Sequence, residues 1–368
     1  MTDLLAPLQS LKAGHWFKLI CGASFQHLPA VRSLALAYTL AGADCIDVAA
    51  DPAVIAAAQE GLQAAKDLVK DAEKRGYSYQ GNLPFLMVSL NDGEDPHFRK
   101  AEFNPSECPP DCHRPCEKIC PAQAIAFNRI DESSGVEAQK CYGCGRCIPV
   151  CPYDKIYTKS YLSTATAIAP LVMSRVVDAL EIHTKVGHLA EFQELWQKIS
   201  PWVDQLKVLA ISCPDGEGMI DYLKAITQLI TPLPSALIWQ TDGRPMSGDI
   251  GDGTTLATVK LGKKVLTVQL PGYVQLAGGT NSYTVAKLKA MGLLKSSEYQ
   301  PQHHVSGIAY GSYARVLLSP ILEQLENQEV SPTSVKANIR LEAKPELLWP
   351  AVKLAHSLVS QIKSQQER

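Results

Sequence analysis

Residues 207–241 read KVLAISCPDGEGMIDYLKAITQLITPLPSALIWQT and contain a complete strand–helix–strand unit. Apolar, β-rich runs at 207–213 and 235–241 flank a helical pattern over 218–230. Two strands joined through a helix in this way run parallel, because the helix carries the chain back across the sheet. This stretch therefore predicts an α/β protein built from βαβ units.

The same alternation recurs on both sides of this unit. The pattern predicts eight strands, at 17–22, 45–49, 84–90, 179–183, 207–213, 235–241, 273–277 and 305–310. Without the stretch between the third and fourth strands, the units occupy about 250 residues, the usual size of a (β/α)8 barrel. We therefore expect a barrel-like scaffold, and an open doubly wound sheet is the alternative that the pattern also allows.

The strand–helix rhythm breaks after the third strand, where cysteines, prolines and polar residues replace the long apolar runs. We expect residues 1–92 and 159–332 to form the barrel-like domain and residues 93–158 to form an inserted domain. The remaining residues, 333–368, have an amphipathic helical pattern and are expected to form a helical tail that packs on the barrel.

Charge and hydropathy exclude two classes of partner. The 368 residues include 35 Lys and Arg against 37 Asp and Glu, so the formal net charge is −2 and there is no basic excess to hold nucleic acid. No apolar stretch reaches the roughly 18 to 20 residues of a membrane-spanning helix. The opening residues, MTDLLAPLQS, lack the basic and apolar regions of a signal peptide. We expect a cytoplasmic protein without a transmembrane segment.

Residues 141–152 read CYGCGRCIPVCP, which is the C-x2-C-x2-C-x3-C-P run of bacterial two-cluster ferredoxins. A short loop must wrap three thiolates around one cube of iron and sulfide. Gly143 and Gly145 allow the tight backbone that this requires and let N–H groups approach the cluster. Pro152 ends the loop and directs Cys151 away, toward a second cluster. The run therefore predicts an iron–sulfur site.

Residues 108–121, CPPDCHRPCEKICP, repeat this run. The matching pairs, each 31 positions apart, are Cys116 and Cys147, Cys120 and Cys151, Pro121 and Pro152, and Ile125 and Ile156. The first two gaps between cysteines hold three residues here, whereas they hold two in the second run. The insert is therefore predicted to be a doubled ferredoxin-type unit with a widened first half.

Ligation in two-cluster ferredoxins crosses between the two runs, so four cysteines are assigned to each cluster. Cluster one is assigned Cys108, Cys112, Cys116 and Cys151. Cluster two is assigned Cys120, Cys141, Cys144 and Cys147. We expect two [4Fe–4S] clusters, and the widened first run leaves a [3Fe–4S] form open for cluster one. The alternatives are zinc sites, which usually pair C-x2-C knuckles across a longer loop, and disulfides, which need an oxidising compartment.

Three further cysteines, Cys21, Cys45 and Cys213, lie in or at the end of predicted strands. Free cysteine in such a position behaves as a small apolar residue. We therefore expect core packing at these three positions, and a redox-active thiol is the alternative.

A possible ligand site of the barrel itself follows its last two predicted strands. Gly278, Gly279 and Thr280 come after the seventh strand, and Gly311 and Ser312 come after the eighth. Loops at these two places often bind phosphate through backbone N–H groups. The five residues therefore predict an anion site for a flavin or phosphorylated ligand, and the alternative is that the glycines only form tight turns.

Other predicted strand ends also carry polar residues, but their spacing assembles no nucleophile and base, so the catalytic residues stay unassigned. These residues are Asp47, Asn91, Glu181, His183, Gln240 and Asp242. The loop at 242–253, DGRPMSGDIGDG, is either a lid or a surface loop.

Three segments outside the cysteine runs give the chain a family resemblance. They are GHWFKLICGASFQHLPAVRSLALAYTLAGADCIDVAADPAVI at 14–55, IWQTDGRPMSGDIG at 238–251 and VQLAGGTNSYTV at 274–285. Together with the doubled cysteine motif, they resemble the cyanobacterial light-dependent-period protein family, LdpA. The resemblance extends over nearly the whole chain, whereas the cysteine motifs alone are shared with many ferredoxins.

The resemblance implies an iron–sulfur protein that reports cellular redox state to the circadian clock, and partners such as the circadian input kinase. Only the eight motif cysteines carry over as functional positions. We therefore expect a redox sensor or electron-transfer adaptor. The alternatives are an oxidoreductase whose barrel binds a flavin or phosphate ligand and uses the clusters as an electron relay, and a structural module whose clusters only stabilise the insert.

Overall fold

The computed structural model describes most of the chain. The described residues are 5–21, 28–77, 82–93, 99–120, 122–127, 135–138, 140, 141, 143, 145–160, 164–231, 233–244, 251, 253–295, 304–329 and 339–363. No helix among them is long and apolar enough to cross a membrane.

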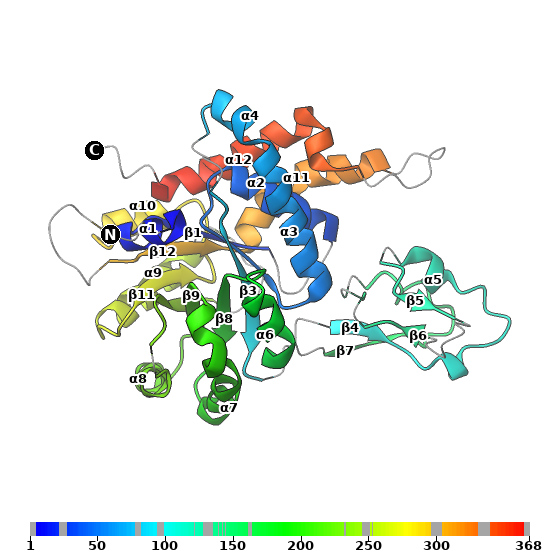
Figure 1. Cartoon of the computed structure of the whole chain (residues 1–368), viewed down its shortest axis with the longest axis horizontal. Coiled ribbons are helices and arrows are strands. Elements are labelled where there is room, and N and C mark those ends of the chain that lie inside the picture. Colours follow the sequence, from blue (N-terminus) through cyan, green and yellow to red (C-terminus); the bar gives the residue numbers. More distant parts are fainter. Residues whose placement is uncertain are drawn as a thin grey trace.

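Eight parallel strands form a closed barrel in the order β1-β12-β11-β10-β9-β8-β3-β2 (Figure 1). The strands are β1 (Trp16–Ile20), β2 (Cys45–Ala49), β3 (Phe85–Asn91), β8 (Ala179–His183), β9 (Val208–Pro214), β10 (Leu237–Asp242), β11 (Tyr273–Ala277) and β12 (Gly307–Tyr310). Because β1 pairs with both β2 and β12, the sheet has no edge. The predicted barrel is confirmed, and the open sheet is excluded.

Helices surround the barrel and follow its strands. They are α1 (Ala6–Ala13), α2 (Leu28–Leu40), α3 (Pro52–Asp67), α4 (Val69–Lys74), α6 (Ala165–Met173), α7 (Leu189–Ile199), α8 (Met219–Leu229), α9 (Thr254–Leu266), α10 (Thr284–Ala290) and α11 (Ser312–Glu329), with the 3-10 helix η2 (Ser200–Gln205). Helix α3 shows how the sequence starts such a helix. The Asp51 side chain accepts hydrogen bonds from the backbone N–H groups of Ala53 and Val54, and Pro52 takes the first helical position.

Successive side chains of a strand alternate between the surrounding helices and the barrel interior, so the core has an outer and an inner part. In β1, Phe17 and Leu19 join the large apolar cluster that includes the surrounding helices, whereas Trp16 belongs to a second apolar cluster that Leu11 of α1 joins. Lys18 has the same parity as Trp16 and lies in the barrel interior, where its side chain is 0% exposed. The interior therefore changes along the barrel from an apolar layer to a charged one.

The cysteine-rich insert leaves the barrel after β3 and projects to the right in Figure 1. Antiparallel strands β4 (Arg99–Glu102) and β7 (Tyr157–Ser160) lead into and out of it. Between them lie η1 (Pro105–Glu107), α5 (Pro115–Ile119) and the short pair β5 (Ile125–Ala126) and β6 (Gly135–Val136). The insert has its own small core, which consists of Ala101, Phe103, Cys116, Ile125, Cys147 and Ile156.

The end of the chain forms η3 (Leu341–Ala343) and the long helix α12 (Pro345–Lys363), which packs against α2 and α11. Its apolar face is buried in the same core as the barrel helices. The Lys363 ammonium lies 2.6 Å from the Asp44 carboxylate at the start of β2. Most of the predicted loop at 242–253 lies outside the described residues, as do residues 333–338 of the predicted tail.

Candidate iron–sulfur site

The two cysteine runs repeat in backbone conformation as well as in sequence. Arg114 has φ +53°, and Gly145, 31 positions later, has φ +72°. Gln123 and Asp154, again 31 apart, both have φ +50°. Left-handed backbone is uncommon outside glycine, so its recurrence at Gln123 and Asp154 indicates that both halves make the same turns.

The matched positions also form the same contacts to sulfur. The Cys120 Sγ accepts a hydrogen bond from the Ala124 backbone N–H at 3.2 Å, and the Cys151 Sγ accepts one from Lys155 at 3.4 Å. A third bond joins the Arg114 N–H to the Cys112 Sγ at 3.4 Å. Such N–H groups stabilise negative charge on thiolates, which is the form that binds iron.

The described ligands predicted for cluster two lie around one small cavity. Cys120, Cys141 and Cys147 line it together with Gly145 and Ile125. Gly143 and Gly145 have φ +77° and +72°, as the sequence predicts for a tight cluster loop. The fourth predicted ligand, Cys144, lies outside the described residues.

The four predicted ligands of cluster one are close enough to affect one another electrostatically. Burial raises the pKa of the Cys108 thiol, and the neighbouring Cys112 and Cys151 raise it further. Burial also raises the pKa of Cys116, to which Cys151, Cys108 and Cys112 add. Thiols that oppose one another's ionisation are stabilised as thiolates when they bind a metal, because the cation neutralises their charge.

The ten described cysteines are all free of disulfide bonds. No three His, Cys, Asp or Glu side chains in the described ranges are placed to share a single metal ion. A cubane cluster does not need such convergence, because each thiolate binds a different iron atom. The described cysteines therefore fit iron–sulfur ligation, in which each thiolate binds its own iron atom.

Cys21, Cys45 and Cys213 are buried away from the insert. Burial raises the pKa of Cys213 to about 12 and raises those of Cys21 and Cys45 well above the ordinary value. Thiols in this state are unreactive at neutral pH. These positions agree with the expected role in core packing.

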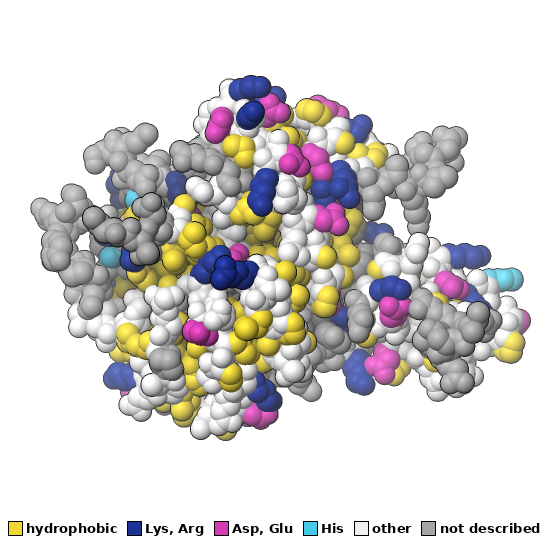
Figure 2. Space-filling view, viewed as in Figure 1, with side chains coloured by type: hydrophobic (Ala, Val, Ile, Leu, Met, Phe, Trp, Pro, Cys, Tyr) yellow, Lys and Arg dark blue, Asp and Glu magenta, His cyan; other side chains and the backbone are white. Residues whose placement is uncertain are grey.

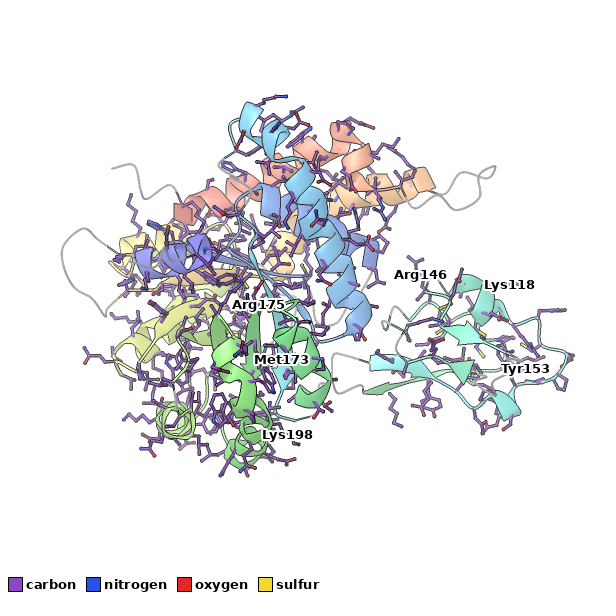
Figure 3. The ribbon with its side chains drawn as sticks, viewed as in Figure 1. Lys118, Arg146, Tyr153, Met173, Arg175 and Lys198 are labelled. Atoms are coloured by element: carbon purple, nitrogen blue, oxygen red, sulfur yellow. The ribbon has the colours of Figure 1, made fainter. Side chains whose placement is uncertain are left out.

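Side chains on the insert surface mix both signs of charge on the face shown in Figure 2. Lys118, Arg146 and Tyr153 point outward from the insert in Figure 3. Tyr153 is 42% exposed, and the pKa of its phenol is raised by Asp111 first and also by Cys112 and Cys108. An exposed aromatic ring therefore lies next to the predicted ligands of cluster one.

At the predicted anion site, the first two glycines occupy a crowded turn. Gly278 and Gly279 have φ +61° and +91°, and a Cβ on Gly278 would lie 2.6 Å from the Arg244 carbonyl oxygen. Their carbonyl groups accept hydrogen bonds from Thr258 and Thr254. These contacts give both glycines a packing role in the turn.

The other predicted anion-site residues, Thr280, Gly311 and Ser312, lie beside the end of β12 and the start of α11. Thr280 is buried and donates its hydroxyl to the Ala309 carbonyl at 2.7 Å. Gly311 and Ser312 lie at the start of α11, where Arg315 donates to the Ser312 Oγ at 3.2 Å and to the Ile20 carbonyl at 3.1 Å. Arg315, which the sequence analysis did not single out, adds a guanidinium to this end of the barrel.

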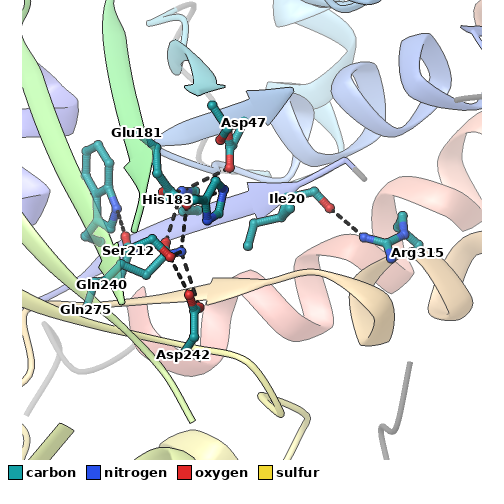
Figure 4. Close-up of polar contacts among 12 residues, drawn as sticks. Ile20, Asp47, Glu181, His183, Ser212, Gln240, Asp242, Gln275 and Arg315 are labelled. Carbon is teal, nitrogen blue, oxygen red and sulfur yellow. Dashed lines mark hydrogen bonds and ion pairs between the residues drawn. The ribbon is translucent and has the colours of Figure 1, made fainter. Parts of the chain in front are cut away.

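A polar cluster inside the barrel brings together strand-end residues from several neighbouring strands (Figure 4). Its members are Lys18, Asp47, Ser89, Glu181, His183, Ser212, Gln240, Asp242 and Gln275. Lys18 at its centre was missed by the sequence analysis. The available signal was a lysine at an interior position of an otherwise apolar strand, whose neighbours Phe17 and Leu19 face the helices.

A separate cavity of about 720 Å³ lies at the opposite end of the strands, between α1, α3 and the start of β3. Lys66, Arg175 and Lys207 are among its lining residues, and Figure 2 shows basic side chains among hydrophobic ones on this face. None of the predicted site residues lines this cavity.

Fold and site together define a (β/α)8-barrel protein that carries a ferredoxin-type insert. Two family models match the chain: the LdpA Fe-S cluster-binding domain over residues 108–162 and the Light dependent period A C-terminal domain over residues 171–361. A protein named Light dependent period A from Synechococcus elongatus is 50% identical over 357 residues, 97% of this chain and 94% of that protein. The chain therefore belongs to the light-dependent-period A family and contains its iron–sulfur cluster-binding domain.

Two other similarities are more limited. One of the subunits of tetrathionate reductase from Salmonella typhimurium is 39% identical over 51 residues, 14% of this chain and 20% of that protein. The solved (S)-3-O-geranylgeranylglyceryl phosphate synthase of Thermoplasma acidophilum aligns over 99% of both chains, with 11% identity and a TM-score of 0.40. The barrel assignment rests on the strand pairing and not on this last likeness.

Proposed function

We propose that the insert, placed at residues 93–158, holds two [4Fe–4S] clusters and makes the chain a redox sensor or electron-transfer adaptor. The observation that carries this proposal is the doubled geometry of the cysteine runs, with matched left-handed turns and matched N–H bonds to Cys120 and Cys151. Cys108, Cys112, Cys116 and Cys151 would hold one cluster. Cys120, Cys141, Cys144 and Cys147 would hold the other.

When bound, such a cluster accepts or donates one electron, and its net charge changes by one. The residues of this chain set the surroundings of that charge. N–H groups point at three cysteine sulfurs, and the insert core that includes Cys116 and Cys147 is apolar. A change of one charge in a medium of low dielectric constant has a large electrostatic effect on neighbouring groups and on a docked partner.

The composition of the cofactor is tested first. The full chain, purified anaerobically, should contain about eight iron atoms and eight acid-labile sulfides, and should show EPR signals after dithionite reduction. A [3Fe–4S] cluster one would instead give about seven irons and a signal in the oxidised protein. Zinc without sulfide, or only about four irons, would contradict the proposal of two clusters.

Cysteine variants test the ligand assignment. Cys116→Ser should lose cluster one, Cys147→Ser should lose cluster two, and each should keep about half of the iron. Cys213→Ser, which changes a buried barrel cysteine, is the matched control and should keep all of it. Full iron content in either motif variant would contradict the assignment of that cysteine.

For the signalling role, we propose a cytoplasmic protein whose partners are clock proteins such as the circadian input kinase. The family membership supports this link, because the relative's name refers to a light-dependent period. The test is the affinity of the full chain for that kinase with the clusters oxidised and reduced. Affinities that differ between the two states support a sensor, and equal affinities contradict it.

The alternative proposal is an oxidoreductase whose barrel binds a flavin or phosphorylated ligand near Gly311 and Ser312. The Arg315 guanidinium beside Ser312 favours this alternative, because it offers donors to an anion. Flavin released from the purified protein on denaturation, and lost from an Arg315→Gln variant, would support it. A purified protein whose only visible absorption is that of the clusters would contradict a resident flavin.

A further inference from the structure

The charged layer inside the barrel is organised around Lys18. Its ammonium donates to Glu181, lies 3.0 Å from the Asp47 Oδ2 and donates to the Gln240 Oε1 at 3.0 Å. These three contacts use all three of its N–H donors. Because Lys18 is also 0% exposed, it cannot reach a ligand, and its role is to hold the two carboxylates in place.

Glu181 links Lys18 in the barrel interior to His183 at the mouth of the barrel. Burial alone would raise the pKa of Glu181, but the charge and hydrogen bond of Lys18 hold it below its ordinary value, so the group stays a carboxylate. Its Oε1 accepts a hydrogen bond from the Gln240 amide at 2.8 Å and lies 3.2 Å from the His183 Nε2. Every oxygen of Glu181 is therefore tied to a neighbour of fixed position.

His183 is the member of this chain of contacts that solvent can reach. It is the last residue of β8, at the carboxyl end of the barrel, and its side chain is 28% exposed. Its Nε2 faces Glu181, and its Nδ1 has no partner among the described residues. An Nε2–H bond to a carboxylate leaves the lone pair on Nδ1, which makes this atom a base.

Packing alone does not account for this layer. Barrel interiors are normally filled by branched apolar side chains, and buried ion pairs often cost more in desolvation than they return. The layer lies where barrel enzymes carry their reactive groups, at the carboxyl ends of the strands. A carboxylate that fixes a partly exposed imidazole is an arrangement used for proton transfer.

We propose that the barrel mouth is an acid–base site in which His183 transfers the proton and Glu181 and Lys18 are positioning residues. The Nδ1–H bond would form as the O–H bond of a ligand hydroxyl breaks, the imidazolium would be held against the Glu181 carboxylate, and the proton would return to an oxygen of the same ligand, so that no oxidant or reductant is needed. The ligand class is a neutral, hydroxyl-bearing small molecule. Within the cluster, the carboxyl groups of Asp47, Glu181 and Asp242 outnumber the single lysine, which disfavours an anion. Burial raises the pKa of Asp47 and Asp242 toward the neutral form, and the remaining members offer hydroxyl and amide groups, which suit a neutral ligand.

The test uses diethyl pyrocarbonate, which acylates unprotonated imidazole nitrogens, on the full chain with its insert. Mass spectrometry of peptides then gives the rate at each histidine. His113 is an exposed reference on the insert, and His188, 27% exposed and 3.1 Å from Asp92, lies on the loop after β8. We expect His183 to react at least as fast as His113 although it is less exposed. A His183 rate well below that of His113 would overturn the proposal without any variant.

The variant Glu181→Gln keeps the shape of the side chain and removes its charge. At a pH at which imidazole is unprotonated, it should slow acylation of His183, because the ring loses the carboxylate that orients Nδ1 and increases its nucleophilicity, and it should leave the rates at His113 and His188 unchanged. An unchanged rate at His183 would show that Glu181 does not position a base. Circular dichroism shows whether the variant is folded.

Inorganic phosphate tests the charge of the ligand. It should not protect His183 from acylation, because the carboxylates on this side of the mouth repel it. Protection by phosphate would overturn the neutral ligand class and would instead support an anion bound across the mouth at Gly311 and Ser312.

Discussion

The Lys100 ammonium of the insert lies 2.6 Å from the Asp51 Oδ2 of the barrel, and both side chains are almost completely buried. The other carboxylate oxygen of Asp51 caps α3 through the N–H groups of Ala53 and Val54. Lys100 also donates to the Ala138 carbonyl, three residues before the predicted ligand Cys141. One side chain therefore joins the N-cap residue of a barrel helix to the chain segment that leads to the predicted ligand Cys141.

Replacing Lys100 with methionine should destabilise the protein by about 3–5 kcal/mol, because it leaves the Asp51 charge buried without its partner. The loss should appear as a lower thermal unfolding midpoint, and hydrogen exchange should increase at the start of α3. Lys159→Met is the matched control in the same two-stranded sheet. Its ion pair with Glu102 is exposed, so it should change stability by no more than about 1 kcal/mol. Equal losses of stability in the two variants would show that the Lys100–Asp51 contact does not stabilise the attachment of the insert to the barrel.

Local sequence predicts the role of Asp51 at the start of α3, but it does not predict the contact of Asp51 with Lys100. Asp51 followed by Pro52 is a helix start that can be recognised from neighbouring residues alone. Lys100 is 49 positions away in the insert, and nothing in its local sequence specifies Asp51 as its partner.

The same limit applied inside the barrel. The strands were predicted because each apolar run is followed by its own helix, but two of the partners of Lys18, Glu181 and Gln240, are 163 and 222 positions away. The polar residues at strand ends were visible, whereas the cluster that they form depends on closure of the barrel. In the insert, by contrast, a 31-residue repeat placed equivalent residues in equivalent turns.

Two glycine-to-alanine variants should distinguish the cost of a side chain at positive φ from the cost of a steric clash with neighbouring atoms. Among the described residues, a Cβ on Gly145 would meet the far end of the Ile148 side chain at 3.9 Å, so Gly145→Ala should cost about 1–2 kcal/mol, the ordinary penalty of left-handed backbone. Gly278→Ala adds a Cβ that lies 2.6 Å from the Arg244 carbonyl oxygen, so its loss of stability should be clearly larger. Thermal unfolding of both variants measures the difference. A smaller loss at Gly278 would contradict the crowded turn described for that loop.

The Arg32–Glu342 pair should make attachment of the C-terminal helix dependent on pH. Burial opposes ionisation of Glu342, but the hydrogen bonds and charge of Arg32 lower its pKa below the ordinary 4.5. A carboxyl group with a lowered pKa in the folded state stabilises the protein above the unfolded pKa, and this contribution is lost as the pH falls through the folded value.

Wild type should therefore be more stable than Glu342→Gln at about pH 7, and the gap should close as the pH is lowered below about 4.5. Urea unfolding of both proteins across this range measures it. Lys74→Gln is a useful control, because the Lys74 pair with Asp71 is exposed on both sides and does not involve Glu342. A gap that does not change with pH would show that Glu342 contributes by packing and not by charge.

The charged layer of the barrel, taken together, should lower the free energy of unfolding. Removing only one of its charges should nevertheless destabilise the protein, because the opposite charges then stay buried without a partner. Lys18→Met leaves Asp47 and Glu181 buried without their cation and should cost about 3–5 kcal/mol. The triple variant Lys18→Met, Asp47→Leu, Glu181→Met removes the lysine together with both of its carboxylate partners and keeps similar volumes. It should recover this loss and equal or exceed wild type in urea unfolding, because no member of the two Lys18 ion pairs is left buried without its partner. A triple variant less stable than Lys18→Met would mean that the layer supports the fold. If the triple variant is more stable than wild type and His183 is no longer acylated rapidly, the charged layer serves the proposed acid–base site at the barrel mouth and not the stability of the fold.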